Sequence, residues 1–246
     1  MKCVILAGGI GSRLSEETIN LPKPMVEIGD RPILWHILNI YSYFKINEFI
    51  ICLGYKGEII KDYFYNYYLN NSDLEIDLEL NKIKFSNKKM PNWKIHLIDT
   101  GKKTETAGRL SYLKKLFNKN ENFFFTYGDG LSDININKLY NHHLKKNKIA
   151  TISLSNPEGR FGKVVLDKNQ LIKSFQEKKD GIDSYVNAGF AVFNSEIFNF
   201  INRKSDILEK DIFPKLAMKG ELNSYIHKGF WKPMDTVRER DELENL

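Results

Sequence analysis

The strongest constraint on the fold is an alternation of buried strands and helices over the first 70 residues. Three consecutive apolar side chains, Val4, Ile5 and Leu6, precede a Gly pair, which predicts a fully buried strand over 2–7. Apolar residues at helical spacing predict a helix over 33–44, and Pro32 suits its first turn. A second buried strand at 48–53 and a helix from about 57 to 69 follow. This order predicts an α/β fold built on a parallel, buried sheet.

The remainder of the chain predicts a mixed sheet. Short alternating stretches between 74 and 98 are typical of antiparallel edge strands or hairpins. The pattern then predicts helices at 105–117 and 135–146, and strands at 123–127, 149–155, 162–166, 171–176 and 185–193. Little helix separates the last four strands, so we expect a mixed, mostly parallel central sheet. With no linker or composition break, residues 1–246 are predicted to form a single domain with two halves, 1–130 and 131–246.

Composition excludes several classes of protein. The net charge of +6 comes from 37 basic and 31 acidic residues that are interleaved along the chain, which disfavours a nucleic-acid partner. No run approaches the roughly 18 to 20 apolar residues of a membrane span, and the seven residues before the Gly pair are too few for a secretory signal. Cys3 and Cys52 stand in apolar runs and are expected to be buried free thiols. We therefore expect a cytoplasmic protein without a membrane partner.

Two short segments could carry chemistry. Gly-Gly-Ile-Gly-Ser-Arg-Leu at 8–14 follows the first strand, where glycines let backbone N–H groups approach an anion. Its spacing fits neither the dinucleotide-binding fingerprint nor the P-loop. Lys23 stands between Pro22 and Pro24, which hold its backbone in an extended form. On their own these residues are more typical of an ordinary tight turn and a solvated lysine than of a phosphate-binding site.

Together the two segments resemble the hallmark of the sugar-phosphate nucleotidyltransferases. Further matches are similar to the glucose-1-phosphate cytidylyltransferase branch of that family and run through nearly the whole chain. They include Pro-Ile-Leu-Trp-His at 32–36, Asp-Thr-Gly at 99–101, Thr-Tyr-Gly-Asp-Gly at 126–130, Gly-Arg-Phe-Gly at 159–162, Ser-Phe-Gln-Glu-Lys at 174–178 and Gly-Phe-Trp-Lys-Pro-Met-Asp-Thr at 229–236. The resemblance implies a Rossmann-like three-layer nucleotidyltransferase fold.

The resemblance also implies roles for individual residues. Asp129 and Asp235 would hold Mg²⁺, a hard cation that prefers oxygen ligands. Arg13, Lys23, Asp129 and Asp235 would be catalytic, with Lys23 stabilising charge in the transition state. The nucleotide would be bound by Leu6, Ala7, Gly8, Gly9, Gly11, Ser12, Arg13 and Lys23, and its base read around Thr104, Gly108 and Arg109. The sugar phosphate would be bound by Gly162, Glu177, Lys178 and Asn187.

The implied activity is transfer of a cytidylyl group from CTP to a sugar 1-phosphate, above all α-D-glucose 1-phosphate, for surface polysaccharide biosynthesis. A nucleotidyltransferase using another nucleoside triphosphate or another sugar phosphate is the first alternative. An inactive nucleotide-sugar-sensing regulatory subunit is the alternative of a different class. Three departures from the family pattern, Ala107, Lys179 and Ala188, adjoin the expected base and sugar sites, so the sugar and strict CTP selectivity stay open. The oligomeric state also stays open, with a homo-oligomer as the alternative to a monomer.

Overall fold

The computed structural model describes residues 1–11, 14, 18–86, 90–156, 163–166, 172–176 and 185–245, with only the backbone of 163–166 and 172–176. Its central feature is a seven-stranded sheet with the order β14-β10-β13-β8-β1-β4-β7. These strands are β1 (Lys2–Leu6), β4 (Glu48–Leu53), β7 (Lys94–Asp99), β8 (Asn122–Tyr127), β10 (Ala150–Ser155), β13 (Val186–Asn194) and β14 (Leu222–Ile226). Only β13 runs antiparallel to its neighbours within this sheet, so the expected mixed, mostly parallel sheet is confirmed.

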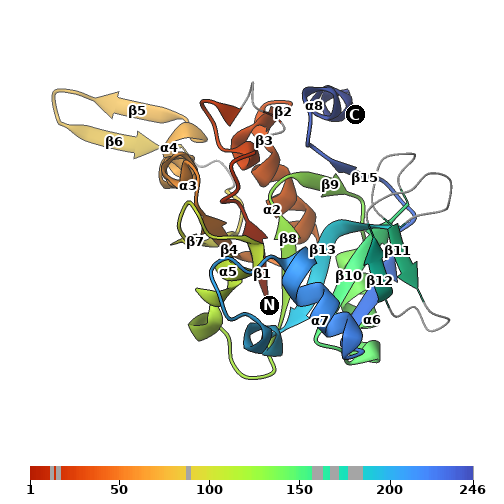
Figure 1. Cartoon of the computed structure of the whole chain (residues 1–246). Coiled ribbons are helices and arrows are strands. Elements are labelled where there is room, and N and C mark those ends of the chain that lie inside the picture. Colours follow the sequence, from red (N-terminus) through yellow and green to blue (C-terminus); the bar gives the residue numbers. More distant parts are fainter. Residues whose placement is uncertain are drawn as a thin grey trace.

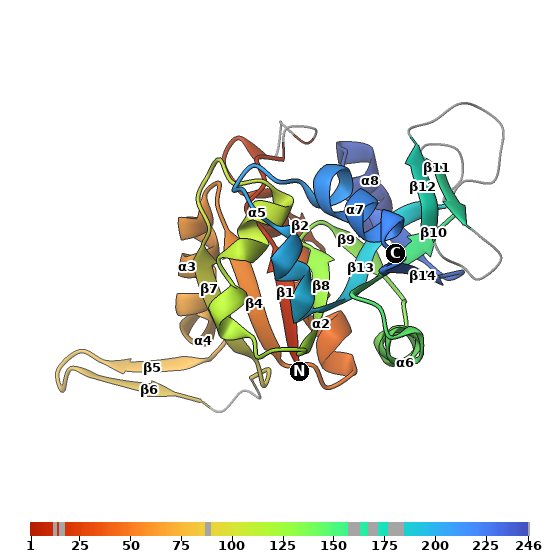
Figure 2. The ribbon, with the colours of Figure 1, turned by 60° about the horizontal axis from the view of Figure 1, so that its bottom comes forward.

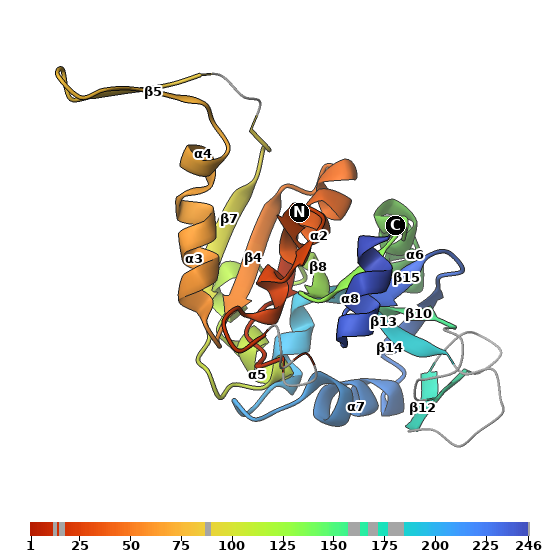
Figure 3. The same cartoon turned by 90° about the horizontal axis from the view of Figure 1, so that it is seen from above.

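Helices cover both faces of the sheet (Figures 1 and 3). Alternate residues of β1 point to opposite faces, as in any strand: Cys3 and Ile5 join one apolar core and Val4 and Leu6 join the other. The first core is covered by α2 (Ile33–Tyr43), α3 (Gly57–Tyr65) and α6 (Ile136–Lys146). The second is covered by α5 (Thr106–Ser111), η4 (Ser195–Phe200), η5 (Leu208–Ile212) and α7 (Phe213–Met218). Helix, sheet and helix therefore form the three expected layers.

Shorter elements complete the fold. They are η2 (Lys23–Met25), β2 (Glu27–Ile28), β3 (Arg31–Pro32), α4 (Tyr67–Asn70), β5 (Leu74–Asp77), β6 (Lys82–Phe85), η3 (Lys114–Leu116), β9 (Gly130–Ser132), β11 (Lys163–Leu166), β12 (Ile172–Gln176), β15 (Trp231–Pro233) and α8 (Val237–Glu244). The β5–β6 hairpin extends away from the rest of the molecule (Figure 2). No helix among the described residues is both long enough and apolar enough to cross a membrane.

Two expectations need correction. The stretch at 94–98 was expected among antiparallel strands or hairpins, but β7 pairs in parallel with β4 at the edge of the main sheet. An edge strand has one partly exposed face, so its alternating pattern matches that of a hairpin strand. The helix expected over 105–117 is shorter, because after α5 the chain tightens into 3₁₀ geometry, with Leu116 N–H donating to the Leu113 carbonyl. Cys3 and Cys52 are buried and free, as expected.

Candidate active site

The site lies where the strand order reverses. From β1 the chain proceeds outward through β4 to β7, and it then returns to place β8 on the other side of β1. In open α/β sheets, ligands bind at such a reversal, beyond the carboxyl ends of the strands. Here the two strand ends are Leu6 and Tyr127, which are paired in register. The glycine-rich loop follows the first strand, and Asp129 follows the second.

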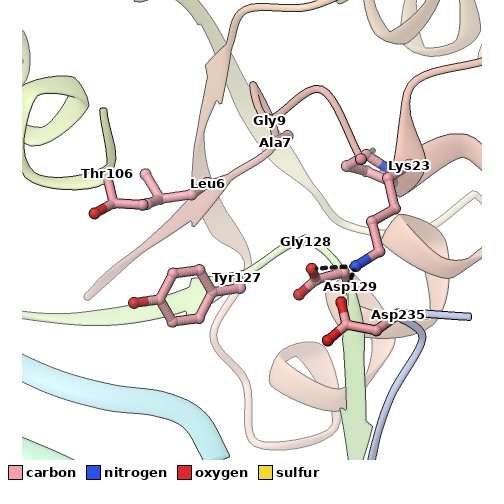
Figure 4. Close-up of a pocket in the computed structure, with 11 residues that line it drawn as sticks. Leu6, Ala7, Gly9, Lys23, Thr106, Tyr127, Gly128, Asp129 and Asp235 are labelled. Atoms are coloured by element: carbon pink, nitrogen blue, oxygen red, sulfur yellow. Dashed lines mark hydrogen bonds and ion pairs between the residues drawn. The ribbon is translucent and has the colours of Figure 1, made fainter. Parts of the chain in front are cut away.

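Three charged side chains meet at this point (Figure 4). The Lys23 ammonium donates a hydrogen bond of 2.8 Å to Asp129 Oδ2 and one of 2.5 Å to Asp235 Oδ1. The lysine side chain is only 10% exposed, whereas those of Asp129 and Asp235 are 36% and 25% exposed. Burial by itself lowers the pKa of Lys23, but the two carboxylates outweigh it and the pKa is raised. The ammonium therefore stays charged between two converging carboxylates.

Local structure holds each of these residues. Lys23 was expected on an extended segment, but it begins the short 3₁₀ turn Lys23–Met25, which contains Pro24 and is closed by a hydrogen bond from Val26 N–H to the Lys23 carbonyl. The Asp129 carbonyl accepts a hydrogen bond from Met234 N–H, next to the antiparallel pairing of β9 with β15. This pairing brings Asp235 beside Asp129, although 105 residues separate them in the sequence.

A capping box fixes the backbone at Asp235. Thr236 caps α8, and its hydroxyl accepts a hydrogen bond from Glu239 N–H. The Glu239 carboxylate accepts hydrogen bonds from the N–H groups of both Asp235 and Thr236, at 2.8 and 2.9 Å. Asp235 is thus held by the first turn of the helix that follows it.

The glycine-rich loop is braced from behind by Arg109. This guanidinium is buried and donates to the carbonyls of Gly8, Leu53 and Gly101 and to the Thr100 hydroxyl. A Cβ on Gly8 would lie 2.3 Å from Arg109 Nη1, whereas a Cβ on Gly9 would meet nothing within 4 Å. Burial lowers the pKa of Arg109. Glycine at position 8 therefore makes room for the arginine behind the loop, and Gly9 faces open space.

Two cavities share the carboxylates. The first cavity, of about 270 Å³, is lined by Leu6, Ala7, Gly9, Gly11, Lys23, Pro24, Thr106, Tyr127, Gly128, Asp129 and Asp235. The second cavity, of about 420 Å³, is lined by Thr126, Tyr127, Asp129, Gly130, Val186, Asn187, Ala188, Gly189, Phe190, Glu209, Trp231, Pro233 and Asp235. Tyr127, Asp129 and Asp235 line both. Two ligands could therefore lie side by side and meet at the carboxylates.

A family model described as nucleotidyl transferase matches residues 2–237 of this chain. The chain belongs to the nucleotidyl transferase family. Among its relatives, glucose-1-phosphate cytidylyltransferase from Salmonella typhi is 45% identical over 246 residues, covering 100% of this chain and 95% of that protein. The probable glucose-1-phosphate cytidylyltransferase of Bacillus subtilis is 38% identical over 247 residues, covering 100% and 96%.

Solved structures agree with the fold of this nucleotidyl transferase. HddC from Yersinia pseudotuberculosis has a TM-score of 0.79 at 21% identity, covering 99% of this chain and 98% of that one. The inositol-1-phosphate CTP transferase from T. maritima has a TM-score of 0.71 at 14% identity, covering 99% and 94%. At such low identity the likeness concerns the fold alone, and it confirms the expected nucleotidyltransferase fold.

Five of the residues predicted to bind the nucleotide and both predicted metal ligands gather at the first cavity. Leu6, Ala7, Gly9, Gly11, Lys23, Asp129 and Asp235 line it. Arg109 lies behind the loop and donates to the Gly8 carbonyl, and a Cβ on Gly108 would lie 2.1 Å from the Lys204 carbonyl oxygen. Thr104 is buried, and its role in reading a base stays a prediction. Asn187 lines the second cavity. Ser12, Arg13, Gly162, Glu177 and Lys178 lie outside the described residues.

Sequence reasoning missed Tyr127, Glu209 and Trp231 as cavity-lining residues, and it covered Thr106 only through the stretch 104–109 that was expected to read the base. Tyr127 could have been found, because it ends the strand that precedes Gly-Asp-Gly. Trp231 could also have been found, because it lies in the 229–236 segment that carries the family resemblance. Glu209 follows no motif, and only the folded chain brings it to the cavity.

The donor set at the carboxylates suits Mg²⁺. Both Asp129 and Asp235 reach one cationic group, so their oxygens converge on one position. Among the described residues, no group of three or more His, Cys, Asp or Glu side chains could hold a metal ion. Mg²⁺ usually takes one or two carboxylates and completes its shell with water and substrate phosphates. Two carboxylates beside a cavity of this kind therefore fit the ion.

Proposed function

We propose that this nucleotidyl transferase transfers a cytidylyl group from CTP to a sugar 1-phosphate, with α-D-glucose 1-phosphate as the first candidate, giving a CDP-sugar and pyrophosphate. The observation that carries the proposal is the meeting of two cavities at Lys23, Asp129 and Asp235. Full-length similarity to glucose-1-phosphate cytidylyltransferases at up to 45% identity supports the choice of substrates.

The reaction forms a bond between a sugar-phosphate oxygen and the α-phosphorus of CTP while the bond to pyrophosphate breaks. Because both reactants are anions, the site has to position them and offset their charge. The first cavity receives CTP, with its phosphates against Gly9 and Gly11 and beside the Lys23 ammonium. The second cavity receives the sugar 1-phosphate, with Asn187 at its wall. No covalent intermediate with the enzyme is needed.

Asp129 and Asp235 would hold Mg²⁺ in this proposal. When bound, the ion would offset negative charge on the reacting phosphates. Lys23 holds the two carboxylates together in the structure described here, and its charge stays available beside the phosphates. The protein's own contribution is thus a fixed pair of carboxylates and a fixed ammonium group at the junction of the two cavities.

The setting of the enzyme follows from this chemistry. A CDP-sugar is an activated sugar donor, so the product would serve surface polysaccharide biosynthesis. The buried free thiols of Cys3 and Cys52 suit a cytoplasmic protein, because thiols stay reduced there. A homo-oligomer is the proposed assembly, because the β5–β6 hairpin exposes apolar side chains, including Ile76 and Ile83 at 57% and 59%.

Pyrophosphate release with Mg²⁺ tests the function. The assay would cross CTP, UTP, GTP, ATP and dTTP with a panel of sugar 1-phosphates that includes glucose 1-phosphate. We expect turnover with CTP and glucose 1-phosphate. Turnover with CTP and a different sugar phosphate would change the identity of the acceptor and leave cytidylyl transfer as the reaction. No turnover with any pair would refute the proposal and favour a regulatory subunit that senses nucleotide sugars.

A further inference from the structure

Glu209 occupies a place between the two cavities that the catalytic carboxylates do not explain. It lies on η5, a single turn of π-helix, and lines the second cavity. Its Oε1 accepts a hydrogen bond from the Tyr127 hydroxyl, and its Oε2 lies 3.4 Å from the Thr106 hydroxyl oxygen, which donates to it. Thr106 lines the first cavity, and Tyr127 lines both. One carboxylate thus connects side chains from both cavities.

The Tyr127 end of this connection is turned away from the catalytic carboxylates. Its hydroxyl points away from Asp129 and toward the side where Thr106 lies (Figure 4). Asn187 also makes a side-chain hydrogen bond to Tyr127, and the Asn187 Oδ1 accepts from Gly189 N–H at 3.0 Å. The amide oxygen is therefore held by the backbone, which directs the amide N–H to the tyrosine. The connection reaches from the second cavity's wall to Glu209.

The Thr106 end is anchored by the backbone of the segment that precedes η5. Leu208 N–H donates to the Thr106 hydroxyl at 2.8 Å. The N–H groups of Ala107 and Gly108 both donate to the Asp206 carbonyl. The first turn of α5 is therefore hydrogen-bonded to the segment that precedes Glu209. A shift of this turn should also shift Glu209.

Charge indicates which part of a ligand Glu209 could face. Both proposed substrates carry phosphates, and an unpaired carboxylate would repel them. Glu209 accepts from two hydroxyl groups and is half-buried, and the Tyr127 hydroxyl that donates to it points away from Asp129 (Figure 4). Its position suits the uncharged, hydroxyl-bearing part of the substrates and leaves the phosphates to the lysine end.

We propose that Glu209 is a positioning residue that ties the two cavities together, holding Thr106 and Tyr127 so that the nucleotide and the acceptor are bound in register. This inference rests on the proposed function for the identity of the two ligands. Thr106 lines only the first of the two cavities. The proposal predicts that a substitution at Thr106 nevertheless weakens binding of the ligand in the second cavity.

Thr106→Val tests this prediction, because it removes the hydroxyl and keeps the shape. The lost hydrogen bond should raise the KM for the sugar 1-phosphate about fivefold. Thr106→Ser keeps the hydroxyl and should raise this KM much less than Thr106→Val does. In a Glu209→Gln background, Thr106→Val should have no further effect on it. Asp211→Asn removes a carboxylate from the same π-helix, where it accepts from Ile207 N–H outside both cavities, and should change neither KM.

Two results would overturn the proposal. The first is a Thr106→Val enzyme whose KM changes for CTP alone. The second is a Thr106→Val effect that is just as large in the Glu209→Gln background. A double-mutant cycle on the free energy of unfolding, with the same two substitutions, tests the tie without any substrate, and additive changes there would also overturn it. Wild-type turnover in the same assay tests the proposed function separately.

Discussion

Two carboxylates on one ammonium group make the proposed catalytic centre sensitive to the loss of a single charge. Asp235→Asn keeps the shape of the side chain and removes one of the two negative charges. We expect kcat to fall about 100-fold or more, because groups that offset transition-state charge contribute on this scale. Pyrophosphate release measures it. Asp241→Asn is the matched control on α8, 57% exposed, and should keep full activity. Near-normal turnover by Asp235→Asn would contradict the metal-binding role.

Adding one methyl group to each of the two adjacent glycines, Gly8 and Gly9, should affect the stability of the protein differently. Gly8→Ala would place its Cβ 2.3 Å from Arg109 Nη1 and 2.9 Å from Gly54 N. Arg109 cannot move aside freely, because four hydrogen bonds hold its guanidinium. We expect a loss of about 1–3 kcal/mol, seen as a lower midpoint in thermal unfolding.

Gly9→Ala is the control for this prediction. Its Cβ would meet no protein atom within 4 Å, so the unfolding midpoint should stay close to that of wild type. The same methyl would project into the first cavity, which Gly9 lines, and the KM for CTP should rise. Equal unfolding midpoints for the two alanine variants would contradict this prediction. They would show that the Arg109 guanidinium can shift with little loss of stability.

At the residue scale, the sequence predicted the centre of the site and part of the cavity walls, and it missed Tyr127, Glu209 and Trp231. Lys23, Asp129 and Asp235 stand in motifs, and the structure brings all three within hydrogen-bond distance. Arg109 also stands in a motif, but the motif does not predict that its guanidinium points to the back of the glycine-rich loop. That direction depends on the missing Cβ atoms of Gly8 and Gly54. Contacts between distant segments decide such orientations.

Among the elements, α6 is attached to the sheet by a buried histidine. His143 Nδ1 lies 2.9 Å from the Thr151 hydroxyl of β10. Burial, and secondarily the charge of His142, lowers the pKa of His143 from 6.5 to about 4. Between these values the unfolded chain binds a proton that the folded protein does not. The stabilisation is therefore complete above pH 6.5 and is lost as the pH falls to 4, by about 3 kcal/mol.

His143→Asn should remove this pH dependence, because an amide does not titrate. Urea unfolding from pH 4 to 7 measures the slope of the unfolding free energy for wild type and variant. Lys145→Gln, on the exposed side of the same helix, is the control and should keep the wild-type slope. A slope that is unchanged in His143→Asn would mean that the ring is also protonated in the folded protein.

The capping box of α8 couples helix stability to the active site. Glu239→Ala removes the acceptor for the N–H groups of Asp235 and Thr236. We expect a stability loss of about 1 kcal/mol, which is usual for a lost cap, together with a lower kcat because Asp235 is less firmly held. Arg238→Ala shortens an exposed side chain in the same turn and should preserve kcat. A wild-type kcat in Glu239→Ala would show that the capping box does not contribute to catalysis.

Strand and helix positions were predictable where apolar periodicity is strong, as in β1, α2 and β4. Periodicity could not give the direction of β7, because a half-exposed edge strand alternates in the same way in either orientation. The pairing of β15 with β9 was also beyond it, because three-residue strands carry no period. Yet this pairing is what places Asp235 beside Asp129.

At the scale of the whole molecule, the β5–β6 hairpin extends away from the rest of the described chain (Figure 2). Its cross-strand pairs Leu74 with Phe85 and Ile76 with Ile83 put four apolar side chains on one face. The ring of Phe85 packs against that of Tyr68, with 4.8 Å between the ring centroids, whereas Ile76 and Ile83 are 57% and 59% exposed. A two-stranded hairpin alone is marginally stable in water, and an exposed apolar face of this kind marks an interaction surface. A second copy of the chain would cover it in the proposed homo-oligomer.

Replacing the apolar pair tests this assembly. In Ile76→Thr/Ile83→Thr the β-branched side chains are kept but the apolar contact is weakened, so the oligomer should dissociate at a concentration where wild type stays assembled. Sedimentation velocity measures the species present. The control is Glu75→Thr/Lys84→Thr, which alters the other face of the same ribbon, where both side chains are exposed and paired at 3.3 Å. It should assemble as wild type does. A wild-type protein that sediments as a monomer, or an isoleucine variant that stays assembled, would show that the hairpin face is not the contact. Activity of the dissociated variant would then tell whether each pair of cavities works within one chain.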